Sequence, residues 1–487
     1  MKVLVYEQIK NAEKLAVESG RFSYTDLMRN AGRTVFNAID ERYDIIGKRF
    51  LIIVGNGNNG GDGLVVAKYL KNAGAFVELY MPLGMPQTET AKAFSAIAAD
   101  LPVCNTLNKD YDFYIDALFG IGFNRFLSDD IAFLINNINI KNGVKIAIDI
   151  PSGMFADGGN AQAVFFADLT VTFIGYKLCQ LLPNTSSYCG EVILDELGID
   201  TSKNYSYSVI EPPKAQKYDK NSHKGTFGTA LLICGSYGMC GAEILSAKAA
   251  LVSGAGIVKA VVCDKNYSAF TGAVPEAVTI PVETSANGVP VIYDKTALSA
   301  LSNASALLIG CGLGHSDDVI STVRKIINLT NVPTVIDADG INAIARDISI
   351  LRNIKAPYIL TPHPGEMARL LNTTVADVEN NRVKYAKRFA CTHQCTVVLK
   401  GANTIVASQD GEIFFNTIGN YGMAKGGSGD LLSGIIVALL ANGYDVLSAA
   451  LTAVYVHAKA GDRAAKKYSK RTMLPSDIIK ELKFISF

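Results

Sequence analysis

The chain has 487 residues, which is more than one hydrophobic core usually supports, so we expect two domains. Apolar side chains make up 49% of the sequence and charged ones 19%, a composition typical of a soluble globular protein. With 46 basic and 45 acidic side chains the net charge is +1, so the composition gives no electrostatic basis for binding nucleic acid or an anionic membrane surface.

No segment of the sequence is a candidate for export or membrane insertion. The first twenty residues lack the apolar core and cleavage site of a signal peptide, and no apolar run approaches the roughly 20 residues of a membrane span. The nine cysteines are odd in number and scattered, which indicates a reducing, cytoplasmic location. Cys391, His393 and Cys395 lie close together but lack a second ligand pair, so a metal site is not favoured there.

Helices and strands alternate over the first two hundred residues. Ser23 and Asp26 have the spacing of a helix start, and apolar residues at helical spacing follow from Leu27 to Ile39. Strands are expected at Phe50–Val54, Phe76–Tyr80, Phe113–Leu118, Lys145–Ile150, Leu169–Ile174 and Glu191–Leu194. This alternation predicts a mostly parallel sheet covered on both faces, with ligands binding at the carboxyl ends of the strands.

The alternation lapses between about residues 195 and 227 and then resumes. We predict domains at residues 1–205 and 229–487, with a linker and lead-in at residues 206–228. Strands of the second domain are expected at Thr229–Cys234, Ile257–Cys263, Ala306–Ile309, Thr334–Asp337, Tyr358–Thr361 and Thr396–Leu399. One helix should begin at Ala242, and two helices that begin near Gly429 and Asp445 should close the chain.

Three polar loops follow strands of the first domain. The sequence NGNNGGDG, residues 56–63, separates a strand from a helix; its glycines let a backbone approach a ligand, and the helix N-terminus offers N–H groups to phosphate. Asp116 and Asp149 end two further strands. Each aspartate alone could cap a turn, but three polar clusters at one sheet edge predict a site. The glycine loop lacks the pattern of a hydride-transfer site.

The motifs NNGGDG, DALFGIGF and DIPSG, in this order and spacing, resemble the NAD(P)H-hydrate epimerase family over residues 1 to about 205. The resemblance implies contacts to the hydrated dinucleotide from Asn58, Asn59, Gly60, Gly61, Asp62, Gly120, Ile121, Gly122, Phe123, Asn124, Arg125, Phe126 and Asp149. It also implies a potassium ion held by Asn59, Asp116 and Ser152, an all-oxygen ligand set that suits a hard cation. Asp149 is the candidate catalytic acid–base residue, because a strand-end carboxylate facing the ring could move the hydroxyl proton.

The second domain carries its own glycine-rich loop, Gly426–Asp430, before an apolar helix. Backbone donors at such a helix start suit phosphate oxygens, and Asp430 can act as a base, although a plain glycine-rich helix start would look the same. Lys400–Thr404 turns between two strands, where one lysine and a backbone loop can hold a phosphate. His363 opens another helix and, taken alone, would more often be structural than functional.

TPHPGE, KGANT and GGSGD, in this order, resemble the NAD(P)H-hydrate dehydratase family over about residues 212–487. The resemblance implies substrate contacts from Ala255, Gly312, His363 and Asp430, and AMP contacts from Lys400, Gly401, Ala402, Asn403, Thr404 and Gly429. Cys311 stands where the family usually has proline, which puts only the fine geometry of that loop in doubt. The implied chemistry is phosphorylation of the C6 hydroxyl and loss of phosphate, with Asp430 as catalytic base, ADP as cosubstrate and magnesium.

The expected fold is therefore α/β in two domains, an N-terminal Rossmann-like three-layer sandwich and a C-terminal ribokinase-like α/β domain. The expected function is repair of hydrated NADH and NADPH (NADHX and NADPHX): epimerisation of their R and S forms, and ADP-dependent dehydration of the S form with release of AMP and phosphate. The epimerase resemblance implies a homo-oligomer. Two alternatives are a ribokinase-like small-molecule kinase with a regulatory dinucleotide-binding domain and a nonenzymatic NAD(P)-binding scaffold.

Overall fold

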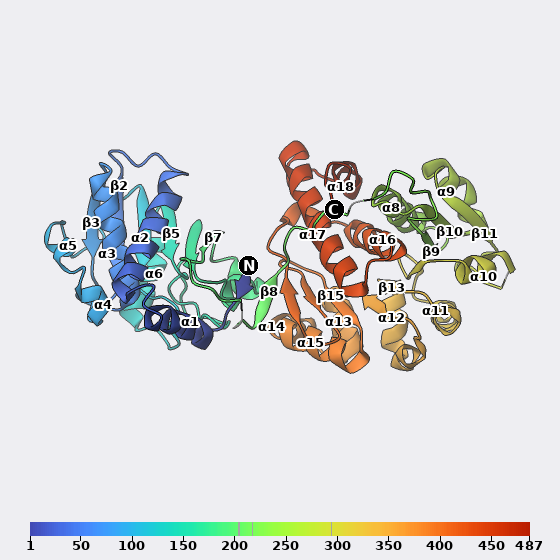
Figure 1. The fold of residues 1–487 in the computed structure, drawn as a ribbon, viewed down its shortest axis with the longest axis horizontal. Coiled ribbons are helices and arrows are strands. Elements are labelled where there is room, and N and C mark those ends of the chain that lie inside the picture. Colours follow the sequence, from blue (N-terminus) through green and yellow to red (C-terminus); the bar gives the residue numbers. More distant parts are fainter. Residues whose placement is uncertain (203–204, 217, 294) are drawn as a thin grey trace. The chain divides into compact units, whose positions relative to one another are not determined.

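The computed structural model describes residues 1–202, 205–216, 218–293 and 295–487, which form two compact units, Met1–Ser208 and Val209–Phe487 (Figure 1). Part of the predicted linker forms a strand, β8 (Tyr207–Val209), and its first two residues pair antiparallel with β1 (Lys2–Val3). Each unit has its own sheet and its own hydrophobic core.

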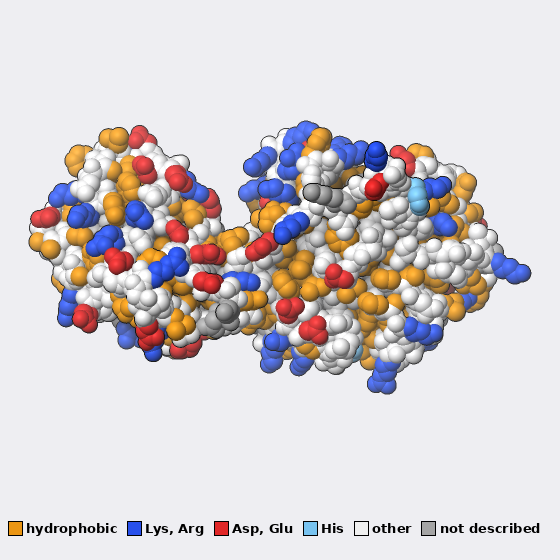
Figure 2. All heavy atoms as spheres, viewed as in Figure 1, with side chains coloured by type: hydrophobic (Ala, Val, Ile, Leu, Met, Phe, Trp, Pro, Cys, Tyr) orange, Lys and Arg blue, Asp and Glu red, His pale blue; other side chains and the backbone are white. Residues whose placement is uncertain are grey.

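The distribution of charged side chains on the surface agrees with the near-neutral net charge. On the face shown in Figure 2, acidic and basic side chains are interspersed over the first unit, without a field of one sign. Within the described residues, none of the helices combines the length and the apolar sequence that crossing a membrane requires.

The first unit is a three-layer sandwich around six parallel strands in the order β3-β2-β4-β5-β6-β7. The strands are β2 (Arg49–Val54), β3 (Phe76–Tyr80), β4 (Phe113–Ala117), β5 (Val144–Ile148), β6 (Leu169–Phe173) and β7 (Glu191–Asp195). One face packs against α1 (Tyr6–Glu18), α2 (Tyr24–Asp40) and α3 (Asn58–Asn72), and the other against α6 (Asp129–Asn139). Short helices are α4 (Glu89–Lys92), α5 (Ala96–Ala99) and α7 (Pro183–Ser186).

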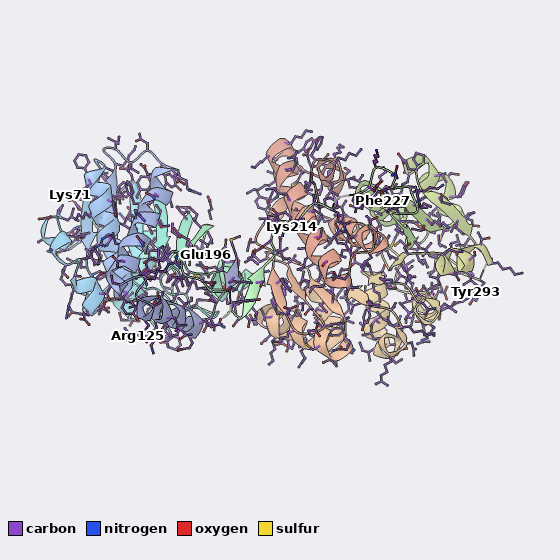
Figure 3. All side chains as sticks on the ribbon, in the orientation of Figure 1. Lys71, Arg125, Glu196, Lys214, Phe227 and Tyr293 are labelled. Atoms are coloured by element: carbon purple, nitrogen blue, oxygen red, sulfur yellow. The ribbon has the colours of Figure 1, made fainter. Side chains whose placement is uncertain are left out.

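The strand order of the first unit creates a place for a ligand. The chain runs from β2 to β3 on one side and returns to β4 on the other, so the loops that follow β2 and β4 diverge and leave a crevice between them. Arg125, in the loop after β4, lies at this end of the unit in Figure 3, whereas Lys71, in the last turn of α3, lies at the opposite end.

The second unit is larger, with strands in the order β17-β16-β15-β14-β13-β12-β9-β10-β11. Its strands are β9 (Thr229–Ile233), β10 (Ile257–Cys263), β11 (Val278–Val282), β12 (Ala306–Ile309), β13 (Thr334–Ile336), β14 (Tyr358–Leu360), β15 (Thr396–Leu399), β16 (Ile405–Ala407) and β17 (Ile413–Phe415). Strands from β15 to β11 are parallel, and β16 and β17 add an antiparallel edge.

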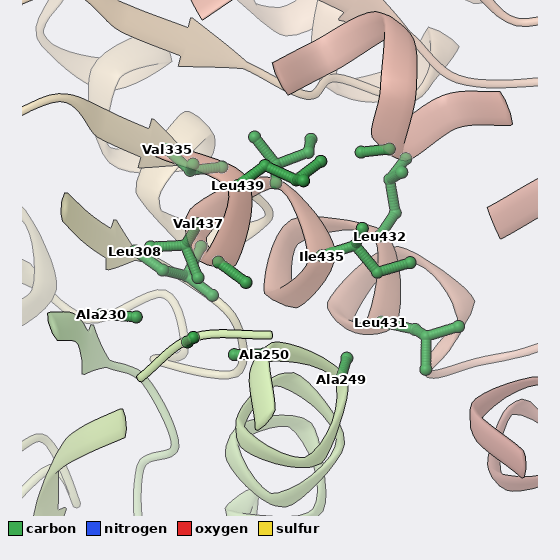
Figure 4. Packing of buried hydrophobic residues seen from close by; sticks show 14 of the residues in the cluster. Ala230, Ala249, Ala250, Leu308, Val335, Leu431, Leu432, Ile435, Val437 and Leu439 are labelled. Atoms are coloured by element: carbon green, nitrogen blue, oxygen red, sulfur yellow. The ribbon is translucent and has the colours of Figure 1, made fainter. Parts of the chain in front are cut away.

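One face of this sheet packs against α8 (Cys240–Val252), α16 (Ser428–Ala441), α17 (Val446–Tyr468) and α18 (Pro475–Leu482). Helix α16 is apolar on nearly every side because it lies between the sheet and α8, as Leu431, Ile435 and Leu439 show in Figure 4. The remaining helices are α9 (Tyr267–Ala273), α10 (Lys295–Ser302), α11 (Asp317–Leu329), α12 (Asp339–Arg346), α13 (Pro364–Leu371), α14 (Val375–Asn380) and α15 (Arg382–His393). In Figure 1, α11, α12, α13 and α15 lie on the opposite side of the sheet from α16.

The α/β class and the two-unit architecture are confirmed, and the differences from expectation are local. Two helices were expected to close the chain, but α18 follows α17. Strand β11 was not predicted, because its sequence is short and contains Pro281, which is compatible with its position at the sheet edge. A strand was expected to extend to Ile150, but β5 ends at Ile148 and Asp149 takes a left-handed backbone conformation with φ +68°.

Candidate active sites

A cavity of about 490 Å³ opens at the carboxyl ends of the strands of the first unit. The predicted residues that line it are Asn58, Asn59, Asp62, Gly120, Ile121, Gly122, Phe123, Asn124, Arg125 and Asp149. Helix α1 closes another side with Tyr6, Ile9, Lys10 and Glu13, none of which the sequence motifs indicated. The strand-end loops and α1 therefore enclose one polar space.

Three of the residues expected to contact the dinucleotide do not line the cavity. Gly60 and Gly61 pack into the protein instead: a Cβ on Gly60 would lie 1.9 Å from the Gly55 carbonyl oxygen, and one on Gly61 would lie 2.6 Å from Met28 Sδ. These two glycines are needed for the close approach of α3 to its neighbours. Phe126 is 83% exposed, and its side chain lies outside the cavity.

The three residues expected to hold potassium are all buried, and two of them, Asp116 and Ser152, are in direct contact. Asp116 accepts hydrogen bonds from the Ser152 amide and hydroxyl, both at 2.7 Å. Burial raises the pKa of Asp116 to about 6, although these hydrogen bonds favour its ionised form. The side-chain nitrogen of Asn59 is buried and has no hydrogen-bond partner among the described residues. If the oxygen and nitrogen of the Asn59 amide are interchanged, an oxygen takes the position of the unpartnered nitrogen. The carboxylate of Asp116, the hydroxyl of Ser152 and the amide oxygen of Asn59 are then all ligands that fit a hard monovalent cation.

Asp149 is held by a buried ion pair that the sequence did not reveal. Lys177, which is 1% exposed, donates hydrogen bonds to Asp149 Oδ1 at 2.5 Å and to Thr172 Oγ1 at 2.6 Å. Gln180 Nε2 donates to the Asp149 carbonyl oxygen at 2.9 Å, and the Ile121 amide donates to Asp149 Oδ2 at 3.3 Å. These contacts hold Asp149 in its left-handed conformation, which is uncommon for residues other than glycine. They also fix its carboxylate beside the loop after β4.

Two other carboxyl groups line the same cavity. Burial raises the pKa of Glu13 to about 7, and the Asp149 carboxylate adds to this while Lys177 opposes it. Burial also raises the pKa of Asp62 well above its usual range, with Asp149 and Glu13 contributing. The cavity thus combines one ion-paired aspartate with two carboxyl groups whose pKa is raised above the usual range.

A second cavity, of about 880 Å³, lies at the carboxyl ends of β13, β14 and β15 and at the N-terminus of α16. The predicted residues that line it are His363, Lys400, Gly401, Ala402, Asn403, Thr404, Gly429 and Asp430. Gly312 is not part of its lining and packs against α8, where an added Cβ would lie 2.9 Å from Ala242 Cβ. Ala255 precedes β10 and therefore lies at the opposite, amino-terminal edge of the sheet, apart from the other expected contacts.

A lysine–aspartate pair also organises this second cavity. Lys400 Nζ donates to Asp337 Oδ1 at 2.6 Å, and Ser433 Oγ donates to Asp337 Oδ2 at 2.8 Å. Burial alone would raise the pKa of Asp337, but Lys400 and the hydrogen bonds lower it. Burial raises the pKa of Asp430 to about 6, with a further contribution from Asp337. Burial also raises the pKa of Glu366 to about 7. Glu366 Oε2 lies 3.8 Å from Lys400 Nζ.

The potential metal ligands that converge in the described residues are Cys311, Asp337 and Asp430, whose ligand atoms all lie within 4.8 Å of one another. The two carboxylates are hard oxygen donors that suit magnesium beside a phosphate, whereas the thiol does not. The sequence cluster around Cys391 is not among the converging groups found in the described part of the chain.

His363 has a structural role at the mouth of this cavity. It caps α13, because its Nδ1 accepts hydrogen bonds from the amides of Gly365 at 3.0 Å and Glu366 at 3.4 Å. Burial lowers its pKa, and the Lys400 charge adds to that effect. The neutral ring still lines the cavity, so capping and ligand contact are compatible.

Among the residues of the second cavity that belong to no motif, two have buried polar atoms and were missed from the sequence. Asn416 Oδ1 and His457 Nε2 are buried and have no hydrogen-bond partner among the described residues. Asn416 is oriented by its own Nδ2, which donates to the Ile418 carbonyl oxygen at 2.6 Å. Burial lowers the pKa of His457 to about 4, so its ring is neutral at pH 7. Since buried polar atoms are nearly always paired, these two atoms are available to a ligand.

These features define a class: a two-domain α/β enzyme with one polar cavity at a sheet switch point and a second beside a glycine-rich helix N-terminus. Residues 24–179 match the family model described as YjeF-related protein N-terminus, and residues 230–483 match the model described as NAD(P)H-hydrate dehydratase.

Full-length relatives are similar along the whole chain. The bifunctional NAD(P)H-hydrate repair enzyme Nnr of Moorella thermoacetica is 33% identical, over 100% of this chain and 96% of its own length. The enzyme of the same name from Coxiella burnetii is 34% identical, over 98% of each chain. A Bacillus subtilis ADP/ATP-dependent NAD(P)H-hydrate dehydratase, co-crystallised with ATP and Mg²⁺, is 32% identical over 55% of this chain and 91% of its own, with a TM-score of 0.48. The chain belongs to the family of bifunctional NAD(P)H-hydrate repair enzymes.

The Lys177–Asp149 pair is expected to be required for the stability of the first unit. Replacing Lys177 with Met leaves a buried carboxylate without its partner, which costs about 3–5 kcal/mol and should lower the melting temperature of the first unit by roughly 10 °C. Adding Asp149→Asn should recover at least half of that loss, because the unpaired charge is then gone. Calorimetry of the full chain measures both, with the transition of the second unit as internal control. A larger loss in the double variant would contradict this account.

Proposed function

We propose that this chain repairs hydrated NADH and NADPH, with epimerisation in the first cavity and nucleotide-driven dehydration in the second. The observation that supports this most directly is the position of Asp430, at the N-terminus of α16 and beside the Lys400–Asp337 pair, in the same chain as the ion-paired Asp149. Cytoplasmic location and homo-oligomeric assembly remain predictions from the sequence.

In the first cavity, the proposed substrate contacts come from the loops at residues 58–62 and 120–125 and from Asp149. A dinucleotide carries phosphate groups, and the start of α3 offers unpaired N–H groups to them. Potassium, held by Asn59, Asp116 and Ser152, would supply a fixed positive charge that favours the ionised form of Asp116. The protein's own part is to orient the hydrated ring beside the Asp149 carboxylate.

In the second cavity, ADP is proposed to bind with its phosphates at Lys400–Thr404 and Gly429, and the hydrated ring is proposed to lie near His363 and Asp430. Hydroxide is a poor leaving group and phosphate a good one, so phosphorylation of the C6 hydroxyl lets the C6–O bond break with release of phosphate. Loss of one C5 proton to solvent then forms the C5=C6 double bond of NADH. Asp430 accepts the hydroxyl proton as the phosphoryl group is transferred, and backbone N–H groups at the start of α16 stabilise the developing charge. Magnesium would neutralise phosphate charge, and the converging carboxylates of Asp337 and Asp430 would supply hard oxygen ligands for it.

Asn416 and His457 are proposed to contact the nucleotide base. Both are buried and uncharged at neutral pH, which suits a neutral base better than phosphate. Asn416 Oδ1 accepts hydrogen bonds only, so it favours a base that presents an amino group, as adenine does, over one that presents a carbonyl oxygen. Such a contact would select adenine nucleotides.

Replacing Asp430 with Asn should lower the rate of AMP and phosphate release from ADP and the S form by about 100-fold or more, because the amide cannot accept the proton. The measurement is phosphate release together with the return of NADH absorbance. Asp410→Asn, at an exposed loop of the same unit, should leave both signals unchanged. Retained turnover in the Asp430 variant would contradict the assignment. A stable phosphorylated product from the unaltered chain would favour a small-molecule kinase.

Replacing Asn416 with Ala should raise the KM for ADP by roughly 5- to 30-fold and leave kcat nearly unchanged, since one hydrogen bond of about 1–2 kcal/mol to the base is lost. The preference for ADP over GDP should fall in parallel. Asn303→Ala, at an exposed position of the same unit, is the matched control. An unchanged KM and base preference in the Asn416 variant would show that the base binds elsewhere.

A further inference from the structure

We propose that Glu13, on helix α1, is the proton donor of the epimerase cavity and that Asp149, held by Lys177, is the ionised partner that accepts a proton. This inference rests on the proposed epimerase function and assigns the two proton-transfer roles within it. It also revises the expectation from sequence, in which Asp149 alone served as acid and base.

Glu13 lines the cavity in which the hydrated ring is proposed to bind. Glu13 lines the same cavity as Asp149 and Lys177, on the side closed by α1. The helix is fixed at that position, because Ile9 and Ala12 are buried in the core of the unit and the Tyr6 amide donates a hydrogen bond to Asp157 Oδ1 at 2.8 Å. Residues 24–179 match the family model of this unit, so α1 lies outside the matched segment.

Asp149 is poorly suited to donate a proton. Its Oδ1 accepts a hydrogen bond from the Lys177 ammonium at 2.5 Å, and the Ile121 amide donates to its Oδ2 at 3.3 Å. Both contacts stabilise the carboxylate rather than the acid. A protonated group must therefore come from another part of the cavity.

The surroundings of Glu13 suit a proton donor. Its carboxyl group is largely buried, and the charged groups that act on it are Asp149 and Lys177 across the cavity and Lys10 on its own helix. Burial and the Asp149 charge raise the pKa of Glu13 to about 7, so it can give up and regain a proton near neutral pH. Asp62 is the other carboxyl group nearby; burial raises its pKa well above the usual range, with Asp149 and Glu13 contributing, and the Asp62→Asn variant below separates its role from that of Glu13.

The resulting steps balance without a redox change. Glu13 donates its proton to the C6 hydroxyl, the C6–O bond breaks, and water leaves while the ring nitrogen lone pair forms a C=N⁺ bond. The Asp149 carboxylate stabilises this cation. A solvent water then adds to C6 from the opposite face, the new C–O bond forms, and the extra proton of that water passes to Asp149. Return of one proton from Asp149 to Glu13 through solvent restores the enzyme.

The test uses the full chain without nucleotide, so that the S form accumulates instead of being consumed. Starting from the R form of hydrated NADH, chromatography follows the appearance of the S form between pH 5.5 and 9. In the unaltered chain kcat should fall as pH rises through about 7, because Glu13 loses its proton. Glu13→Gln should lower kcat at pH 6.5 by about 100-fold or more, leave KM within about threefold and abolish that fall. Glu13→Asp should restore part of the rate and the pH dependence.

Glu7→Gln is the matched control, because Glu7 is exposed on the same helix and does not line the cavity. ADP-dependent dehydration of purified S form should stay at the unaltered rate in every variant, which shows that the chain is intact. Epimerisation at the unaltered rate and pH profile in Glu13→Gln would overturn the inference, as would a loss confined to Asp62→Asn. Failure of the unaltered chain to epimerise at any pH would instead overturn the proposed function.

Discussion

A buried lysine–aspartate pair lies at the carboxyl edge of each sheet, and the polar cavity of each unit is organised around it. Lys177 and Asp149 are 2.5 Å apart in the first unit, and Lys400 and Asp337 are 2.6 Å apart in the second. A buried charge is tolerated when it is paired and hydrogen-bonded, so each pair requires fixed neighbours such as Ser433. The parallel strands supply that rigidity, because their ends meet at one edge.

Burial, together with the charges of each pair, shifts the pKa of the carboxyl groups around it. In the first cavity, burial and the Asp149 charge raise the pKa of Glu13 to about 7. In the second, burial and Asp337 raise the pKa of Asp430 to about 6, and burial raises that of Glu366 to about 7. Acid–base chemistry requires neighbouring groups with different pKa values, and such environments provide that difference. The two units have different strand orders, and each contains this arrangement.

The sequence predicted the fold well and the sites in part, for physical reasons. Buried strands are short apolar runs, so most were located within one or two residues, and glycine loops marked both cavities. The backbone of Asp149 could not be foreseen, because its left-handed conformation depends on contacts from Lys177 and Gln180. Glu13 and His457 were missed because each is a single residue on an otherwise ordinary helix, brought to its cavity by packing alone. The position of Ala255 at the opposite sheet edge, by contrast, follows from the sequence order, because Ala255 precedes the predicted parallel strand Ile257–Cys263.

The central claim is that one chain carries out both repair steps, and an equimolar mixture of the R and S forms of hydrated NADH tests it most directly. With ADP and magnesium, the unaltered chain should return the whole mixture to NADH, followed by absorbance in the near ultraviolet. The Asp149→Asn variant should convert the S half at the unaltered rate and then slow to the rate of spontaneous epimerisation. If the unaltered chain slows to the spontaneous rate at half conversion, the first cavity is not an epimerase site; if it forms no NADH at all, the account of the second cavity is wrong.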